Sequence, residues 1–541
     1  MQEIFNVSRF LELTAESTPD GCALKVPISR NDRGIVYSER SFSQLCREAD
    51  ATARLLQGRG VTRGMRVLLM VRPGLDLILI TFALFKLGAI PVIIDPGMGL
   101  KNFLTCVARS QPKALIGISL AQWISRLFFK KFGSVKIKIP VVANEFLKEV
   151  ANFSQKPFPL ADTGRDELAA ILFTSGSTGA PKGVCYLHGH FESQVKLLGD
   201  AYLFKPGEVD LPMLPVFALF NPAFGMTTVV PEMNPSRPAS VDPSKIAQAI
   251  LQCGVTNTFG SPVLWNKIAN YCEGRDIVFP SIKRVLMAGA PVSPDLFRRM
   301  KKLIPNGEVF SPYGATECLP IASISGTEVI ESTAPLSCVG KGTCVGKPFP
   351  GINVSIIPVE DGPVNFPQTL PPNTIGEIIA KGPVVTESYD QLPEATFLAK
   401  IEEGQSIWHR MGDVGYLDAD GRLWFCGRKA ERVVSHQGIF YTDCCEAVFN
   451  QHPNVYRSAL INFSTPNATL PAIVVEPKPN HFPKTATQLA LFSNELRLLA
   501  QKHPHTEKIQ KFFFHKSFPV DVRHNAKIHR LHLGRFFSRK G

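Results

Sequence analysis

One stretch of this chain combines residue types that suit the binding of phosphate groups. Residues 172–184 read LFTSGSTGAPKGV, an apolar pair followed by hydroxyl side chains, glycines and one lysine. Glycine tolerates the backbone angles of a concave turn whose N–H groups surround an anion, while hydroxyls add donors and lysine adds positive charge. We therefore expect a polyphosphate-binding loop made of Thr174, Ser175, Gly176, Ser177, Thr178, Gly179 and Lys182.

The context of this loop separates it from other glycine-rich segments. Lys182 is preceded by Pro181 and followed by Gly183, which differs from the Gly-Lys-Ser/Thr ending of a Walker A loop. A flexible Ser/Gly linker is the alternative, but linkers rarely follow directly on a strand-like apolar run such as AAILFT. The position after a strand favours a binding loop.

Three more segments carry side chains that suit a nucleotide site. Glu317, in FSPYGATECLP, offers a carboxylate beside a tight turn, and Mg²⁺ takes such oxygen ligands where it bridges phosphates. Asp413, in WHRMGDVGYLD, could accept hydrogen bonds from ribose hydroxyls, and Arg428 could reach the same sugar or a phosphate. Lys527, in DVRHNAKIHR, could reach over a reacting carboxylate from a separate domain. Taken singly, each is more typical of a turn, a surface or a solvated basic tail, so only their joint occurrence indicates a site.

The composition fits a folded protein with more than one domain. The chain has 541 residues, of which 45% are hydrophobic and 19% charged, and its formal net charge is +13. This charge would attract nucleic acid, anionic lipid or a phosphorylated substrate alike, but no zinc finger, helix-turn-helix or aromatic RNA-binding motif stands out. The 12 cysteines form no CxxC pair and the first residues form no apolar signal segment, so we expect a cytoplasmic protein with reduced thiols.

Helix-like and strand-like apolar segments alternate through the first part of the chain. Helices are expected over 41–57 and 75–87, and strands over 35–37, 67–71, 90–94, 114–116, 141–142 and 169–173. The most apolar run, 77–94, contains Lys86 and Pro91 and is expected to be a buried helix and strand, not a membrane span. This alternation predicts an α/β fold with parallel sheets flanked by helices, in which ligand loops follow the carboxyl ends of strands.

From about residue 352 the pattern changes to strand-like alternation with Pro-rich turns. This predicts a small antiparallel β piece, including a hairpin whose turn is Asp420-Gly421. A small α+β unit is predicted after it, with helices over 443–451 and 487–502 and strands over 458–461 and 472–475. We expect an N-terminal domain of residues 1–429 and a small, mobile C-terminal domain of residues 430–541 that carries Lys527.

The order of these segments resembles the adenylate-forming superfamily, which includes acyl-CoA synthetases, peptide-synthetase adenylation domains and luciferase. TSGSTGAPKG resembles its phosphate loop, AGAP at 288–291 its adenine-side turn, YGATE its Mg²⁺-binding segment, GDVGYLD its ribose segment and GRKAERV its hinge. The resemblance implies that Thr174, Glu317 and Lys527 are catalytic, and that Glu317 binds Mg²⁺. Beyond the phosphate loop, the nucleotide-binding residues that it implies are Gly289, Ala290, Pro291, Tyr313, Gly314, Ala315, Thr316, Asp413 and Arg428.

The resemblance also implies a reaction. In this superfamily a carboxylate attacks the α-phosphate of ATP, which gives an acyl adenylate and pyrophosphate, and a lysine and Mg²⁺ stabilise the charge that develops on the oxygens. The small domain then rotates for a second step. We therefore expect a ligase that uses ATP and Mg²⁺.

Several positions depart from the thioester-forming members of the superfamily. Ala218 lies nearest the position where many of them carry histidine, Ala430 occupies a hinge position that usually holds Asp or Lys, and Ala526 stands before Lys527 in place of glycine. Together with FALFNPAFGMTTVVPEMNPSRPASVDP and YTDCCEAVFNQHP, these segments resemble the β-lactone synthetases of olefin biosynthesis. In that subgroup the adenylate of a long-chain 2-alkyl-3-hydroxy acid is attacked by its own 3-hydroxyl, so that a β-lactone closes and AMP leaves. No external thiol is needed, because nucleophile and carbonyl are held at a large effective concentration.

Two other functions stay open from the sequence. One is a fatty acyl-CoA or acyl-AMP ligase of the same fold, and the other is a nucleic-acid- or membrane-binding protein without catalysis. A candidate lining for an alkyl pocket, with ordinary core packing as the alternative, is the cluster Phe217, Phe220, Phe224 and Met226. The basic C-terminal segment, which includes Phe536 and Phe537, could touch anionic lipid or another enzyme of the same lipid pathway, or be merely solvated. We expect a 3-hydroxy fatty acid and ATP as partners, and no nucleic acid.

Overall fold

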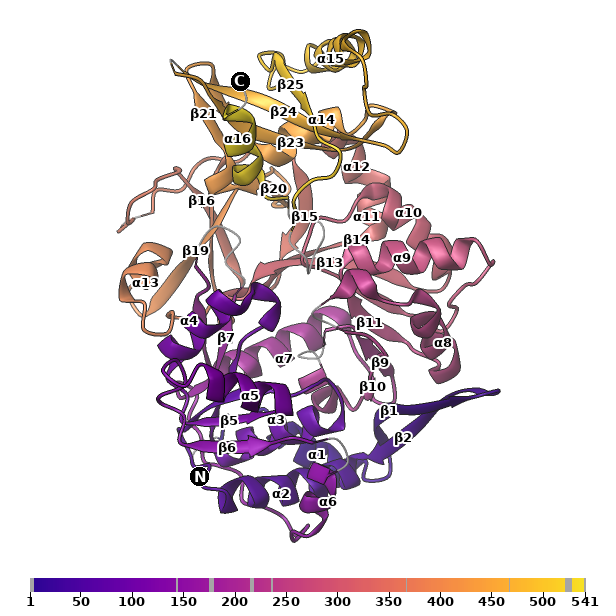
Figure 1. Cartoon of the computed structure of the whole chain (residues 1–541), viewed down its shortest axis with the longest axis vertical. Coiled ribbons are helices and arrows are strands. Elements are labelled where there is room, and N and C mark those ends of the chain that lie inside the picture. The colour runs from indigo at the N-terminus through magenta and orange to yellow at the C-terminus, as the bar shows by residue number, and fades with distance from the viewer. Residues whose placement is uncertain are drawn as a thin grey trace.

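The computed structural model describes residues 4–142, 145–174, 180–214, 218–234, 237–365, 367–466, 468–520 and 528–539. The elements follow one another along the long axis of the molecule, with the N-terminal helices at one end and the C-terminal elements at the other (Figure 1). Within the described residues, no helix is both long and apolar enough to cross a membrane. The apolar run 77–94 forms most of helix α3 (Leu75–Leu87) and strand β4 (Ile90–Ile93), as predicted.

The first sheet has six strands in the order β6-β5-β3-β4-β7-β8. Neighbouring strands are parallel except for the antiparallel pair β7 and β8. Besides β4, its strands are β3 (Arg66–Met70), β5 (Ala114–Gly117), β6 (Ile137–Pro140), β7 (Leu168–Phe173) and β8 (Gly183–Leu187). The strands predicted around residues 67, 90, 114 and 169 are confirmed.

The strand predicted at Val141-Val142 is wrong, because the strand lies just before these valines. β6 is the outermost strand of its sheet and pairs with β5 alone. Only one of its faces is buried, so apolar Ile137 and Ile139 alternate with exposed Lys136 and Lys138. A search for a continuous apolar run, which marks a strand buried on both faces, therefore missed it.

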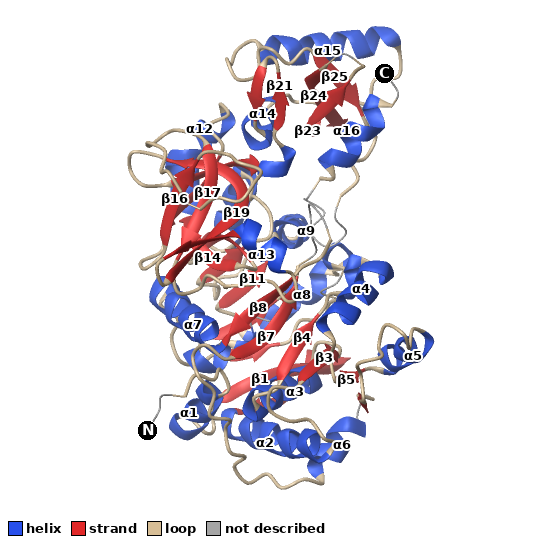
Figure 2. Cartoon of the chain, turned by 90° about the vertical axis from the view of Figure 1, so that its left-hand side faces the viewer, coloured by secondary structure: helices blue, strands red, loops and turns tan. Residues whose placement is uncertain are grey.

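Helices cover both faces of this sheet (Figure 2). The cluster on one face includes α2 (Phe42–Gly58), α3 and α6 (Glu145–Ala151), and the cluster on the other includes α4 (Leu100–Ser110) and α5 (Ser119–Leu127). Ser41 caps α2 by accepting a 3.2 Å bond from the Gln44 backbone N–H, while the Gln44 side chain accepts from the Ser41 backbone N–H at 2.9 Å. Helix α1 (Arg9–Ser17) packs near α2, and the helices predicted over 41–57 and 75–87 are confirmed.

The second sheet begins with a largely parallel half. Its order there is β13-β12-β11-β9-β10-β1-β2, with only the last pair antiparallel. The strands are β1 (Cys22–Asn31), β2 (Gly34–Ser41), β9 (Val209–Pro212), β10 (Thr227–Val229), β11 (Asn257–Gly260), β12 (Arg284–Met287) and β13 (Glu308–Ala315). The helices packed in its main core are α8 (Pro243–Cys253), α9 (Pro262–Glu273) and α10 (Pro294–Leu303), while a second cluster joins α7 (His188–Tyr202) to both sheets.

The other half of the second sheet is antiparallel, in the order β16-β17-β19-β20-β15-β14-β13, with β18 beside β19. Its strands are β14 (Cys318–Ser325), β15 (Thr343–Pro348), β16 (Asn353–Ile357), β17 (Gly376–Lys381), β18 (Lys400–Glu403), β19 (Ser406–Leu417) and β20 (Leu423–Arg428). The short helices α11 (Gly326–Glu328), α12 (Ala334–Cys338) and α13 (Pro393–Ala399) accompany them. The predicted hairpin is confirmed: Asp418 accepts backbone bonds from Asp420 and Arg422 in the turn between β19 and β20.

The chain ends in a small α+β unit, as predicted. Its strands form a pair, β21 (Val433–Ser435) with β22 (Gly438–Phe440), and a three-stranded sheet of β23 (Val455–Ser464), β24 (Thr469–Pro477) and β25 (Lys511–Phe514). Its helices are α14 (Thr442–Phe449), α15 (Ala486–Ala500) and α16 (Arg530–Ser538). The α/β fold class with this additional unit is confirmed, while the domain boundary at residue 429 stays a prediction.

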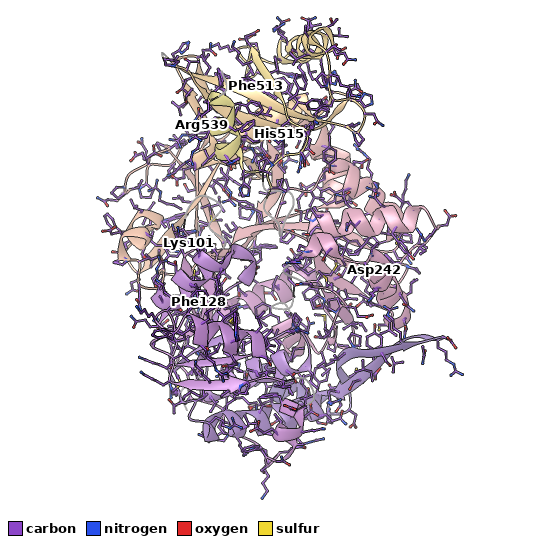
Figure 3. All side chains as sticks on the ribbon, viewed as in Figure 1. Lys101, Phe128, Asp242, Phe513, His515 and Arg539 are labelled. Atoms are coloured by element: carbon purple, nitrogen blue, oxygen red, sulfur yellow. The ribbon has the colours of Figure 1, made fainter. Side chains whose placement is uncertain are left out.

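The basic C-terminal segment is a helix packed on this unit, not a solvated tail. Phe537 is buried and its ring stacks on Phe513 with 4.7 Å between centroids. Phe536 contacts His515, which Figure 3 shows close to Phe513. Both rings therefore pack against this unit, and contact of the segment with lipid or with another enzyme stays a prediction.

Candidate active site

A cavity of about 1590 Å³ lies beside β7, β13 and β19. Every predicted site residue that the structure describes lines this one cavity, namely Thr174, Lys182, Gly289, Ala290, Pro291, Tyr313, Gly314, Ala315, Thr316, Glu317, Asp413 and Arg428. The predicted residues outside the described part of the chain are Ser175, Gly176, Ser177, Thr178, Gly179 and Lys527. Ile528, which follows Lys527, lines the same cavity. The roles assigned to all of these residues remain predictions.

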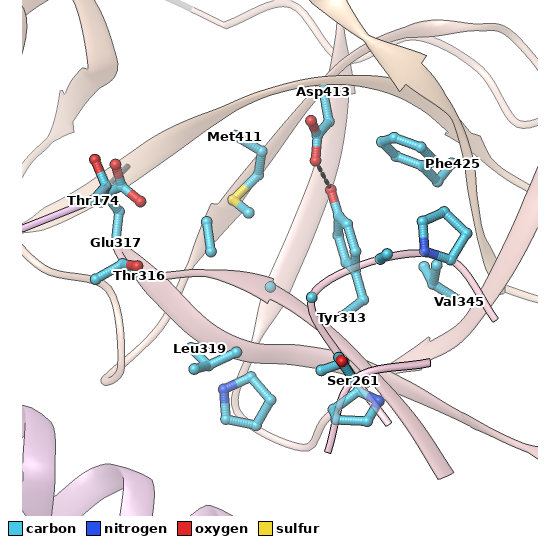
Figure 4. Close-up of a pocket in the computed structure, with 18 of the residues that line it drawn as sticks. Thr174, Ser261, Tyr313, Thr316, Glu317, Leu319, Val345, Met411, Asp413 and Phe425 are labelled. Carbon is cyan, nitrogen blue, oxygen red and sulfur yellow. Dashed lines mark hydrogen bonds between the residues drawn. The ribbon is translucent and has the colours of Figure 1, made fainter. Parts of the chain in front are cut away.

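Tyr313, Asp413 and Arg428 form a hydrogen-bonded group on one wall. The antiparallel pairing of β19 with β20 sets Asp413 opposite Arg428, and Nη1 of the arginine lies 2.9 Å from Oδ1 of the aspartate. The hydroxyl of Tyr313 donates to Oδ2 of Asp413 over 2.6 Å (Figure 4). Burial raises the pKa of Tyr313 well above its usual value, and the neighbouring carboxylate adds to this, so the phenol stays a donor. The group fixes a nearly buried carboxylate where it can accept bonds from a sugar.

Glu317 lies in the turn between β13 and β14, close to Thr174 and Thr316 (Figure 4). The hydroxyl of Tyr389 donates a 2.7 Å bond to Oε1 of Glu317. The backbone N–H and hydroxyl of Thr386 both donate to the carbonyl of Glu317, at 2.9 and 3.0 Å, and the ammonium of Lys400 donates to the carbonyl of Thr386. The position of Glu317 is therefore fixed through both its main chain and its side chain.

This arrangement fits a magnesium ion that is bound mainly by a nucleotide. Mg²⁺ at such sites takes one or two carboxylates and completes its shell with phosphate oxygens and water. The wall offers the carboxylate of Glu317, and no group of three or more His, Cys, Asp or Glu side chains forms a closed metal site within the described residues. Glu317 would hold the ion, which would neutralise phosphate charge.

The base of the predicted phosphate loop lies at the edge of the first sheet. The backbone N–H of Thr174 donates to the carbonyl of Lys182 over 2.9 Å, just beyond the pair of β7 and β8. Arg109 donates from Nη1 to the carbonyl of Pro181 at 3.0 Å. The ammonium of Lys182 lies 4.7 Å from the centroid of the Tyr389 ring. Lys182 and Glu317 therefore share Tyr389 as a neighbour, which brings the lysine and the acidic turn together.

Two glycines shape other parts of the cavity lining. Gly289 has a φ of +95°, which lets the chain turn sharply after β12. A Cβ atom on Gly314 would lie 2.6 Å from the carbonyl oxygen of Cys318, so only glycine allows β13 and β14 to approach here. Both positions belong to the segments that were predicted to contact the nucleotide.

Known proteins are similar to this chain over most of its length. The family described as AMP-binding enzyme matches residues 11–390. The chain belongs to this family. The olefin beta-lactone synthetase of Xanthomonas campestris pv. campestris is 41% identical over 98% of this chain and 97% of that protein. The protein of the same name from Stenotrophomonas maltophilia is 42% identical over 97% of this chain and 96% of its own.

Solved structures show the same fold. ATP-bound MatB from Rhodopseudomonas palustris superposes with a TM-score of 0.80 over 99% of both chains, at 20% sequence identity. MenE from Bacillus subtilis in complex with AMP gives a TM-score of 0.75 over 96% of this chain and 97% of that chain, at 21% identity. This chain therefore has the fold of MatB and MenE.

In this AMP-binding enzyme the cavity also has an apolar part. The predicted alkyl-pocket residues Phe220, Phe224 and Met226 line it, whereas Phe217 lies outside the described residues. Sequence reasoning missed further apolar lining residues from α7, β9 and the segments next to them, which include Phe191, Leu198, Phe204, Met213 and Leu214. They were missed because their apolar patterns equally predict ordinary helix and strand packing.

Sequence reasoning also missed three polar residues near the acidic turn, namely Tyr389, Lys400 and His409. Lys400 and His409 sit opposite each other on β18 and β19. Burial lowers the pKa of Lys400 to about 8, with Glu317 opposing the shift, and burial lowers the pKa of His409 well below its usual value. His409 is 2% exposed and lines the cavity, and its Nδ1 has no hydrogen-bond partner in the described part of the structure. None of these three residues belongs to a motif, so no sequence signal marked them.

Asp210 is a buried carboxyl group in the cavity wall of this AMP-binding enzyme. Asn221 donates to its Oδ2 over 2.9 Å and also donates to Thr228 over 2.8 Å. Burial raises the pKa of Asp210 to about 7 from the usual 3.8, and the bond from Asn221 offsets only part of that effect. This carboxyl therefore loses its proton in the folded protein at a much higher pH than in the unfolded chain.

We expect Asp210→Asn to stabilise the enzyme at high pH and not at low pH. Because the folded pKa lies above the unfolded one, the wild type loses stability as pH rises from about 4 to about 7 and does not recover it above that. Asparagine has the same shape as aspartate but does not titrate in this range. The variant should therefore not undergo this loss of stability, which is on the order of 2–4 kcal/mol. Thermal unfolding should show a melting temperature several degrees above wild type near pH 8 and nearly equal to it near pH 4.5.

Asp200→Asn is the matched control, since Asp200 is exposed at the end of α7. It should leave the melting temperature unchanged at both pH values. A difference between Asp210→Asn and wild type that is the same at low and high pH would contradict the raised pKa.

The segment that links β20 to the C-terminal unit forms ion pairs with both parts of the protein that it joins. Nζ of Lys429 lies 3.2 Å from Oε2 of Glu377, on β17. Two residues later, Glu431 accepts a 3.0 Å bond from Arg530, whose Nε also lies 2.6 Å from Oε1 of Glu446. Arg530, at the start of α16, lines the cavity beside Ile528. Ala430 is the residue between the two contacts.

Proposed function

We propose that this enzyme activates a long-chain 2-alkyl-3-hydroxy acid with ATP and then closes the activated acid to a β-lactone. In the first step a carboxylate oxygen forms a bond to the α-phosphorus of ATP, and pyrophosphate leaves. In the second step the 3-hydroxyl oxygen forms a bond to the acyl carbon, its proton is lost, and the bond from that carbon to AMP breaks. The products are the β-lactone, AMP and pyrophosphate.

The cavity supports this proposal because it joins a polar nucleotide end to an apolar end. Asp413, held by Tyr313 and Arg428, would accept bonds from the ribose hydroxyls. Thr174 and Lys182 would bind phosphate oxygens at the acidic turn, and Lys527 would stabilise the charge on the reacting carboxylate and phosphoryl oxygens. Mg²⁺, held by Glu317, would neutralise charge on the leaving pyrophosphate. An apolar end near Phe220 and Phe224 would take alkyl chains and limit water near the adenylate.

One observation carries the choice of ring closure over thioester formation. The two proteins named olefin beta-lactone synthetase match nearly the whole chain at 41% and 42% identity. A 2-succinylbenzoate–CoA ligase of Geobacillus kaustophilus matches at 31% over 78% of the chain. This second match supports an acyl-CoA ligase as the other candidate. Ala218 offers no imidazole where many thioester-forming relatives carry one.

The two candidates differ in whether a product forms without CoA. We expect the purified enzyme, given ATP, Mg²⁺ and a long-chain 2-alkyl-3-hydroxy acid, to release AMP, pyrophosphate and a β-lactone that mass spectrometry detects at low temperature. The matching acid without the 3-hydroxyl should give pyrophosphate and acyl adenylate but no lactone. Turnover only after addition of CoA would contradict the proposal, and no pyrophosphate with any acid would favour a non-catalytic binding protein. Lys527→Ala serves as the negative control for the first step.

A further inference from the structure

Helix α5 turns three of its four large apolar side chains to solvent, while the fourth, Ile124, is partly buried against the core. Leu120, Trp123 and Leu127 recur at the three- and four-residue spacing of one helix face, and 60%, 59% and 55% of each residue is exposed. Phe129, just beyond the helix, is 65% exposed. We call these four residues the α5 surface. Its large side chains form a contiguous apolar face on solvent, which monomeric proteins rarely present without a partner.

The inner face of α5 shows that this orientation is fixed. Ala121, Gln122 and Ser125, which are small or polar, face the sheet and are buried. The Gln122 amide donates to the carbonyl of Ile139 at 3.1 Å and to that of Gly117 at 3.3 Å. A helix that only covered a sheet would show the opposite distribution, with large apolar residues inside. The packing of α5 on the sheet therefore does not require apolar residues on the outward face of the helix.

The surroundings of the α5 surface are basic. Residues 96–144 contain no aspartate or glutamate, and their eight cations are Lys101, Arg109, Lys113, Arg126, Lys130, Lys131, Lys136 and Lys138. Arg126, Lys130 and Lys131 are exposed next to the apolar residues, and none of these three forms an ion pair with any residue that the structure describes. Helix α4, which carries Lys101, lies beside α5 at the same margin of the molecule (Figures 1 and 2). Figure 3 shows Lys101 and Phe128 on this side.

We infer that the α5 surface docks this enzyme onto an anionic lipid surface. An aromatic and aliphatic face surrounded by lysine and arginine matches the boundary between acyl chains and anionic headgroups, where apolar residues insert and cations pair with phosphates. A protein partner fits less well, because lysine is depleted at protein interfaces. Trp123 also suits the membrane interface, where an indole has an apolar body and a polar N–H.

Vesicle co-sedimentation tests the inference with the full-length protein and needs neither ATP nor an acid. We expect wild type to bind phosphatidylcholine vesicles that contain phosphatidylglycerol roughly tenfold more strongly than pure phosphatidylcholine vesicles, and to bind less as salt rises. The double variant Trp123→Ser/Leu127→Ser should lose about tenfold in binding to the anionic vesicles. Lys130→Glu/Lys131→Glu should abolish the preference for anionic lipid, while the apolar face is intact.

Leu491→Ser/Leu498→Ser is the matched control, because it removes two exposed leucines from another helix, α15. It should bind vesicles like wild type. Equal binding by wild type and Trp123→Ser/Leu127→Ser, or equal binding to neutral and anionic vesicles, would overturn the inference. So would a wild type that ignores vesicles and self-associates in lipid-free buffer through this face. Because the assay contains no substrate, its result is independent of the proposed reaction.

Discussion

Glu317→Gln should lower the rate of pyrophosphate release by about 10²–10³-fold, with a higher Mg²⁺ concentration needed for half-maximal rate. The amide keeps the size of the side chain and can still accept the bond from Tyr389, so the turn between β13 and β14 should keep its shape. What is lost is the negative charge beside Thr174 and Thr316, at the end of the cavity that we assign to phosphates. The measurement is the initial rate of acid-dependent pyrophosphate release across a Mg²⁺ titration.

Tyr389→Phe is the control for this prediction. It removes the hydroxyl that donates to Glu317 but leaves the carboxylate and its charge. We expect a loss of about tenfold or less, the effect of one hydrogen bond that positions the carboxylate. A Glu317→Gln enzyme with the Mg²⁺ dependence of wild type would show that this carboxylate does not serve the metal.

Asp413→Asn should raise the KM for ATP by about 10–150-fold, because a hydrogen bond to a charged acceptor contributes roughly 1.5–3 kcal/mol. The amide can still accept from Tyr313, but it removes the charge that faces Arg428 and weakens acceptance from ribose hydroxyls. Tyr313→Phe, which removes only the supporting hydroxyl, should cost less, about tenfold or below.

A cycle with 2′-deoxy- and 3′-deoxy-ATP isolates the contact between Asp413 and the sugar. In wild type, removal of the ribose hydroxyl that Asp413 binds should raise the KM for the nucleotide. In Asp413→Asn, the same removal should raise the KM much less. If each deoxy analogue raises the KM by the same factor in both enzymes, Asp413 does not contact the ribose and only supports the fold of the cavity wall.

Much of the fold could be predicted from the chain, because its local signals agree with its tertiary packing. The Ser41 cap with Gln44, and the Asp420-Gly421 turn, define α2 and the β19–β20 hairpin from neighbouring residues alone. Strand β6 was not predicted at its true position. An edge strand that is buried on one face alternates apolar and polar residues, and here the alternation is too short to distinguish from a loop. Which strands join into the second sheet depends on long-range contacts, which no local pattern encodes.

The residues of the site also divide into those that the sequence could predict and those that it could not. Residues in motifs, such as Lys182, Glu317 and Asp413, could be named in advance and line the same cavity. Lys400 and Asp210 could not, because neither belongs to a motif and a charged residue is usually exposed unless the fold buries it. The outward face of α5 was missed for the opposite reason: its apolar residues predict an ordinary core helix, and only the packing shows that they face solvent.

The two contacts around Ala430 have a mechanical consequence. Lys429 is anchored to the antiparallel half of the large sheet and Glu431 to the start of α16, so a reorientation that keeps both anchors must come from the main-chain torsions at Ala430. The pair Arg432–Asp361, at 3.2 Å, of which only the aspartate is exposed, would have to separate. The side chain of Ala430 is only a methyl group, so neither of the two flanking parts of the protein holds it in place. In the proposed rotation, α16 would then move with Glu431, and the arc that it can travel is set by the two main-chain dihedral angles of Ala430.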